Sequence, residues 1–187
     1  LDPNTAGSGV PRYVVDSSDQ KANGAEIEVQ WEPVADLLLN ANVAYIDSLY
    51  GNKIASSGAD LSGQPTGVPK YSYALGLQYT WHIQGGELVF NLSHAYRGKH
   101  RCNNDSQLQG TCDVSPNFTT RSSRSRTDMR LGWTSPDDHW GVAAYVSNLF
   151  DHRYVLGVNN ISASVFGTPF AHISPPRMYG VELQVKY

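Results

Sequence analysis

The sequence has few charged residues, only two cysteines and no long apolar run. Charged residues make up 17% of its 187 positions, against roughly 25% in a typical globular domain. No apolar stretch reaches the roughly 20 residues of a membrane-spanning helix, since the best candidate, 34–44, is interrupted by Asp36, Asn40 and Asn42. The net charge of -3 gives no indication of nucleic-acid binding. These absences argue against a helical membrane protein and against a nucleic-acid partner.

Recognisable catalytic motifs are also missing. The sequence contains no nucleophile elbow, no phosphate-binding loop and no dinucleotide fingerprint. Its six histidines are scattered, without the spacing of a metal motif such as HExxH. We therefore expect no enzyme, no resident metal and no cofactor.

Aromatic residues and alternating patterns are what the sequence does contain. There are eleven Tyr and four Trp, and several segments alternate apolar and polar side chains, which is the period of a strand. In the last segment, 176–187, one face carries Tyr179, Val181, Leu183, Val185 and Tyr187. Such a strand suits a soluble sheet with one buried face. It equally suits a transmembrane barrel, in which the apolar face meets lipid and the polar face lines the lumen.

Seven such segments predict an all-β, antiparallel, up-and-down fold. They cover 11–31, 37–46, 71–82, 88–97, 128–133, 140–150 and 176–187, with an interruption at 17–24 in the first. A helix is the competing interpretation of 37–46, because Ala and Leu are good helix formers. Its asparagines, Val43 and Tyr45 favour a strand instead.

The connections between these segments alternate between short and long. Short turns are expected at 33–36, 83–86 and 135–139, and long loops at 48–70, 98–125 and 151–175. A β-sandwich has no reason to sort its loops by end, whereas an outer-membrane barrel has short periplasmic turns and long extracellular loops. The pattern predicts a transmembrane barrel segment with a periplasmic C-terminus. Aromatic residues at the short-turn rim are expected to form an interfacial girdle: Trp31, Trp81, Trp133, Trp140 and Tyr187.

Several motifs, taken in order from about residue 23, resemble one family. The stretch 148–154 (NLFDHRY) resembles the "NLFD..Y" motif near the C-terminus of TonB-dependent outer-membrane receptors, and 176–181 (PRMYGV) resembles the "PR.YGV" that opens their last strand. Upstream, 23–33 (NGAEIEVQWEP) is similar to a "GxExE…W.P" strand of these receptors, and 67–71 (GVPKY) to an "xPK" strand entry.

The resemblance implies a receptor for energised uptake of a scarce nutrient, most often a ferric siderophore or a similar chelate. Such receptors have about 22 strands around a plug, so residues 1–187 are expected to be the C-terminal portion of the barrel, without a plug or an energy-coupling box. The implied partners are outer-membrane lipid and lipopolysaccharide of a Gram-negative bacterium, a small-molecule ligand, and a TonB-type periplasmic coupler reached through the missing part. The alternatives are a small outer-membrane pore or barrel enzyme, and a soluble β-sandwich binding module.

Two groups of residues are candidates for a site. Cys102 and Cys112 fall in one long loop, where an oxidising compartment favours a disulfide of about 2–3 kcal/mol; the alternative is a metal site using His100, Asp105 or Asp113. Basic residues leave one strand and enter the next, and could bind lipopolysaccharide phosphates or an anionic chelate, since guanidinium suits oxyanions. An ordinary solvated rim is the alternative. With His172 of the last long loop, the candidate contacts are Arg97, Lys99, Arg101, Arg121, Arg124, Arg126 and His172.

Overall fold

The structure, a computed structural model, describes residues 18–55, 58–83, 85–102, 112–115, 118–159 and 170–186. Its strands are β1 (Gln20–Val34), β2 (Leu37–Tyr50), β3 (Tyr71–Ile83), β4 (Gly86–Arg97), β5 (Asp113–Ser115), β6 (Phe118–Thr119), β7 (Arg124–Thr134), β8 (Trp140–Ser147), β9 (Val155–Asn159), β10 (Phe170–Ile173) and β11 (Met178–Val185). Within these ranges the chain forms no helix, and so none that could cross a membrane.

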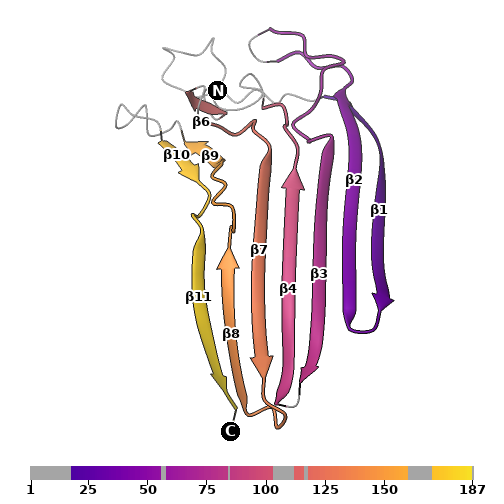
Figure 1. The fold of residues 1–187 in the computed structure, drawn as a ribbon. Coiled ribbons are helices and arrows are strands. Elements are labelled where there is room, and N and C mark those ends of the chain that lie inside the picture. The colour runs from indigo at the N-terminus through magenta and orange to yellow at the C-terminus, as the bar shows by residue number, and fades with distance from the viewer. Residues whose placement is uncertain are drawn as a thin grey trace.

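Seven long strands form a single antiparallel sheet in the order β1-β2-β3-β4-β7-β8-β11 (Figure 1). Each strand pairs with the next long strand in the chain, without a crossover. The predicted all-β, up-and-down arrangement of seven strands is therefore confirmed. The helical interpretation of 37–46 is wrong, because β2 pairs along its length with β1 on one side and with β3 on the other.

The structure corrects several strand boundaries. The interruption predicted at 17–24 does not extend past Asp19, because residues 20–23 pair with residues 47–50 at the end of β2. The predicted strand residues before Ser18 lie outside the described part of the chain. β8 ends at Ser147 rather than at residue 150, since Asn148 adopts a left-handed φ of 55°. Two short hairpins, β5–β6 and β9–β10, lie within stretches that the sequence predicted as loops.

The register separates the apolar and polar side chains of the sheet onto opposite faces. Across β2, β3 and β4, Leu39 is opposite Leu77 and Leu77 is opposite Leu92, whereas one residue further along the polar residues Gln78 and Asn91 are opposite each other. Within the described residues, no second layer covers the apolar face. The hydrophobic residues that are buried in this part of the chain are few, namely Ala55, Leu61, Cys112, Ala143 and Val155. A sandwich core is therefore absent from the described chain.

The short and long connections lie at opposite ends of the sheet (Figure 1). The turns after β1 and β7 each contain an aspartate in the left-handed region, Asp36 with φ 68° and Asp138 with φ 58°. Near these turns lie the tryptophans of β1, β3, β7 and β8, of which Trp31, Trp81 and Trp140 are exposed and Trp133 is half-buried. Their role in a membrane girdle stays a prediction, and Tyr187 lies outside the described residues.

Candidate functional site

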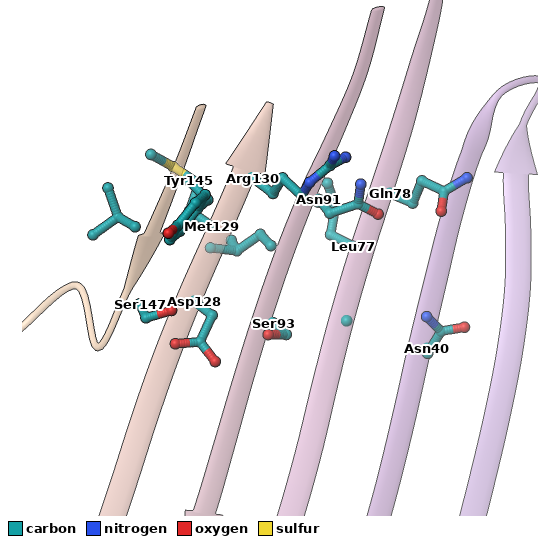
Figure 2. Close-up of a pocket in the computed structure, with 13 residues that line it drawn as sticks. Asn40, Leu77, Gln78, Asn91, Ser93, Asp128, Met129, Arg130, Tyr145 and Ser147 are labelled. Carbon is teal, nitrogen blue, oxygen red and sulfur yellow. The ribbon is translucent and has the colours of Figure 1, made fainter. Parts of the chain in front are cut away.

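The polar face of the sheet carries a hollow of about 340 Å³ that crosses β2, β3, β4, β7 and β8. Two rows of side chains lie across it, because the register places polar residues of neighbouring strands opposite one another (Figure 2). The rows contain Gln78, Asn91, Arg130 and Tyr145 in one and Asn40, Ser93 and Asp128 in the other. Amide, hydroxyl and charged groups make this face suitable for contact with water and polar solutes.

Charged side chains in the middle of the polar face have partners on the same face. Arg126 Nε donates to Asp128 Oδ1 at 2.8 Å, and Arg130 Nη2 donates to Glu182 Oε2 at 3.1 Å. These pairs are exposed, so each contributes at most about 1 kcal/mol to stability. Their main consequence is electrostatic, because each arginine charge is cancelled locally.

The long-loop end of the same face has positive charges without such partners. Arg97, the last residue of β4, is opposite Arg124, the first residue of β7. Neither arginine forms an ion pair with another described residue. His100 lies close by: burial lowers the pKa of this imidazole, and the charges of Arg97 and Arg124 lower it further. These three residues are called the Arg97–His100–Arg124 cluster below.

Two nitrogens of this cluster are buried without a hydrogen-bond partner among the described residues. They are Nδ1 of His100 and Nε of Arg124. The guanidinium of Arg124 is otherwise held in place, since it lies over the Tyr154 ring at 5.5 Å from the centroid and donates through Nη2 to the Thr120 carbonyl oxygen at 3.5 Å. Buried polar groups are normally paired, so these nitrogens are candidates for binding an acceptor.

The other basic candidates are not gathered into this cluster. Arg126 is paired with Asp128, and Arg101 donates through Nη1 to the Gln64 side-chain oxygen. Lys99 and Arg121 are exposed. His172 lies on β10 in the last long loop, where its ring contacts Phe170 edge-on at 5.2 Å between centroids. The structure thus brings together Arg97 and Arg124 from the predicted set, and adds His100.

Cys102 and Cys112 are joined in a disulfide, with their Cα atoms 5.6 Å apart. Cys112 is fully buried, and its carbonyl oxygen accepts a hydrogen bond from the Thr120 amide at 2.9 Å. The bridge therefore connects the chain just after His100 to the segment that leads into β7. The described residues contain no group of three or more potential metal ligands; Asp105, considered as a ligand, lies outside them.

A hydrogen-bonded junction around Asn148 was not predicted as a site. The Asn148 amide group donates to the carbonyl oxygens of His152 at 3.2 Å and Pro175 at 3.1 Å, and its side-chain oxygen accepts from the His152 amide at 3.0 Å. Its own backbone amide donates to Asp128 Oδ1 at 2.8 Å. The motif at 148–154 marked this place in the sequence, but only the structure shows what the asparagine contacts.

Comparison with known proteins places these features in a family. The sequence matches the family described as TonB dependent receptor-like, beta-barrel, over residues 1–149. The fold is similar to the crystal structure of the ferric yersiniabactin uptake receptor FyuA from Yersinia pestis, with a TM-score of 0.67, 20% identity, and coverage of 91% of this chain and 24% of that one. It is also similar to the siderophore receptor PiuA from Acinetobacter baumannii, with a TM-score of 0.61, 18% identity, and coverage of 91% and 22%.

The chain therefore spans about a quarter of the length of each of these two receptors. At such identities the similarity is one of fold. The matched family and both structures are receptors and not enzymes, which confirms the expectation drawn from the missing catalytic motifs.

Proposed function

The chain belongs to the TonB-dependent receptor-like β-barrel family, and on this premise we propose that it forms part of the wall of an outer-membrane receptor for a scarce nutrient. The family match confirms the resemblance to these receptors and covers the motifs at 23–33 and 67–71, whereas most of 148–154 and all of 176–181 lie beyond the matched residues. In the proposed receptor, residues 1–187 are the C-terminal portion of a larger barrel, and the plug is supplied by another part of the protein.

The two-faced sheet is the observation that carries this proposal. Large apolar side chains on one face remain exposed along strands at both ends of the sheet order, for example Ile27 at 63% and Leu183 at 69%. The polar face carries the hollow lined by amides, hydroxyls and ion pairs. Lipid outside and water inside satisfy both faces at once. A strand of about 12 residues tilted by roughly 45° also has the height of a bilayer core.

The proposed orientation puts the long-loop end outside the cell and the short turns in the periplasm. It follows from the sorting of connections, which is the rule for outer-membrane barrels. Because β11 ends at the level of Trp140, beside a short turn, the C-terminus is periplasmic in this orientation. Lipopolysaccharide then surrounds the apolar face at the long-loop end, and ligand arrives from the same side.

The proposed ligand is a ferric siderophore or a similar chelate, and uptake is energised by a TonB-type periplasmic partner. The names of the two similar receptors, for ferric yersiniabactin and for a siderophore, support the ligand class. The energy coupler would act through the plug and not through this part of the wall. This chain would contribute the wall, the polar hollow and the long loops that first meet the ligand.

Deletion of the natural full-length gene tests the proposal. We expect the deletion strain to lose growth on at least one ferric siderophore under iron limitation, and plasmid-borne wild-type gene to restore it. Deleting the TonB-type coupler in the complemented strain should abolish that uptake again. The proposal is wrong if the protein fractionates with soluble material, or if uptake of every tested chelate is unchanged by the deletion. Uptake that persists without the coupler would indicate a passive pore.

A further inference from the structure

We propose that the Arg97–His100–Arg124 cluster binds an oxyanion group, a carboxylate, phosphate or sulfate, of a small molecule that enters the barrel from the long-loop end. This inference rests on the proposed function and deepens it. It assigns a negative charge to the ligand and a binding site on the barrel wall to that charge. The cluster lies where β4 ends and β7 begins, at the upper border of the polar face.

The arginines on the polar face of β4 and β7 differ in whether they have an acidic partner. Register puts Arg97 opposite Ser72 on β3 and opposite Arg124 on β7. Arg126 and Arg130 lie further along β7 on the same face and are neutralised by Asp128 and Glu182. Arg97 and Arg124 have no acidic partner among the described residues. Two like charges side by side repel each other unless an anion lies between or beside them.

The cluster also contains two buried nitrogens without hydrogen-bond partners among the described residues. Nε of Arg124 is buried without a partner although the rest of its guanidinium is fixed against Tyr154 and Thr120. Nδ1 of His100 is likewise buried without a partner. With the imidazole proton on Nδ1, an oxyanion can accept from both nitrogens, and charge-assisted bonds of this kind are about twice as strong as neutral ones. Water could satisfy one donor, but it would leave the two positive charges uncompensated.

Backbone hydrogen bonds and the disulfide hold the chain that carries the cluster in place. The amide of Gly98 donates to the Tyr71 carbonyl oxygen at 2.8 Å, and the amide of His100 donates to the Arg121 carbonyl oxygen at 3.3 Å. The disulfide begins two residues after His100. The chain that carries the imidazole is therefore tied to both neighbouring segments. Donors that are positioned in advance lose less entropy when a ligand binds.

The face on which the cluster lies distinguishes a ligand from a lipid headgroup. Arg97 and Arg124 follow the polar register, whereas their chain neighbours Tyr96 and Ser125 are opposite each other on the apolar face. Headgroup phosphates of the surrounding membrane would meet the apolar side. The proposed anion therefore belongs to a molecule inside the barrel.

Titration of the natural full-length protein in detergent with inorganic phosphate, followed by phosphorus NMR, tests the site. We expect saturable binding that sulfate displaces. Arg97→Gln, His100→Gln and Arg124→Gln should each weaken binding by roughly tenfold, the usual effect of one charge-assisted hydrogen bond. Arg126→Gln is the matched control, because it removes the same charge from the same strand and face but from a paired residue. We expect it to change phosphate affinity less than twofold.

Arg124→Lys tests whether phosphate binding needs the Nε donor of Arg124 in addition to its positive charge. It keeps the positive charge and loses Nε, so we expect weaker phosphate binding than in the wild type. Heat-modifiable migration on gels checks that each variant still forms a barrel. The proposal is overturned if the wild-type protein shows no saturable phosphate binding, or if the three cluster variants bind as the wild type does. It is also overturned if Arg126→Gln weakens binding as much as they do, since that would reveal only a diffuse potential.

A second experiment tests whether the cluster binds a lipid headgroup instead of a small molecule. It also distinguishes failure of this inference from failure of the proposed function. The receptor is placed in lipid nanodiscs with and without lipopolysaccharide, and phosphate affinity is expected to be equal in both. Loss of phosphate binding in the presence of lipopolysaccharide would assign the cluster to a lipid headgroup and overturn the inference. If uptake of ferric siderophores requires the gene but phosphate does not bind, the oxyanion site fails while the receptor function stands.

Discussion

At the scale of single residues, Asn148 shows how one residue can join several segments through its side chain and its backbone amide. It is 5% exposed and contacts the start of the last long loop at His152, the end of that loop at Pro175, and Asp128 on β7. Asparagine fits this place for two reasons. It tolerates the left-handed backbone better than most residues, and its amide offers both donors and an acceptor.

Asn148→Ala should loosen the base of the last long loop. The change removes the side chain's three hydrogen bonds and leaves buried groups unpaired, at roughly 1–3 kcal/mol for such groups. We expect amide exchange in 149–159 and 170–177 to speed up at least about tenfold, with β2, β3 and β4 unchanged, by hydrogen-exchange mass spectrometry. Asn148→Gly also loses the three hydrogen bonds but adopts a positive φ without strain. Comparison of the two variants therefore separates the effect of the lost hydrogen bonds from that of backbone strain. Wild-type exchange in both variants would contradict the role.

Asp151 makes the same region sensitive to acid. Its Oδ1 accepts from the Arg177 amide at 2.8 Å, and this bond lowers the pKa of Asp151 below its ordinary value of 3.8, with Arg153 adding to the effect. The folded state therefore favours the carboxylate. Its stabilisation is present above the unfolded pKa and is lost as pH falls through the lower folded pKa.

The expected result is faster exchange of the Arg177 amide, corrected for its intrinsic rate, once the pH falls below about 3.8. Asp151→Asn supplies the comparison, because an amide oxygen accepts the same bond but does not titrate in this range. The step in the pH profile should be absent from this variant. The assignment to Asp151 is wrong if both proteins show the same acid-induced step.

At this scale, the role of a residue could be predicted only where the residue belonged to a recognisable sequence pattern. The cysteine pair could be predicted because two cysteines in one loop of an exported protein leave few alternatives. Arg97 and Arg124 could be listed as candidates, but not told apart from Arg126, because strand alternation places Asp128 on the face of Arg126 without showing that the two side chains form an ion pair. His100 was considered only as a metal ligand, because a lone histidine in a loop gives no signal of which charges surround it.

At the scale of elements, the pair β8–β11 shows how an aromatic ring of one strand can cover a glycine of the neighbouring strand. Tyr145 is directly opposite Gly180, and a Cβ added to Gly180 would lie 2.6 Å from the tyrosine hydroxyl oxygen. The ring therefore occupies the space that any other residue at position 180 would need. The ring also contributes to the polar hollow on this face (Figure 2).

Gly180→Ala should displace Tyr145 and destabilise the pairing of β8 with β11. Overpacking of this kind costs typically about 1–3 kcal/mol, and we expect the midpoint of urea unfolding of the full protein in lipid vesicles to fall. Gly141→Ala is the matched control in the same strand pair, because its added Cβ would meet Gln184 at an ordinary 3.5 Å. Shortening Tyr145 to Ala together with Gly180→Ala should relieve the clash. Equal effects of the two glycine variants would argue against the ring contact.

The disulfide should act on one loop and not on the sheet. Replacing Cys102 and Cys112 together by Ser removes a closed loop worth about 2–3 kcal/mol of unfolded-state restriction. We expect faster exchange in 98–100 and 118–123, with β4 and β7 protected as before. Reduced wild-type protein should behave like the double variant. Mass spectrometry before and after reduction provides the check, and two free thiols in exported protein would show that the bridge does not form.

Strands were predictable where alternation was strict, and their ends were not. β3 was expected at 71–82 and is Tyr71–Ile83, because every second residue is apolar throughout. β1 and β7 extend four or more residues beyond the alternating parts that predicted them, since their outer ends carry no alternation of apolar and polar side chains but continue the backbone pairing with β2 and β4. The hairpin β9–β10 carries no alternation to mark it, and a register shift interrupts its pairing.

At the scale of the whole molecule, the sheet has two edges along which no described strand pairs. β1 and β11 are the outermost strands, and exposure is high on both, with Trp31 at 59% and Val181 at 75%. In lipid, the free backbone groups of such edges would be left without hydrogen bonds, which a membrane protein avoids. Because the sheet is antiparallel and has seven strands, β1 and β11 run in the same direction. Pairing them with each other would require a parallel junction that occurs nowhere else in this sheet.

Each edge is therefore expected to pair antiparallel with a strand from the rest of the proposed receptor. Residues 1–187 produced alone should give no monodisperse, heat-modifiable species in detergent. Producing them together with the remaining strands as a separate chain should restore a folded barrel, read by gel migration and by protection of β1 and β11 amides from exchange. A folded, monomeric barrel formed by the 187 residues alone would contradict this, and would require β1 and β11 to close the wall themselves.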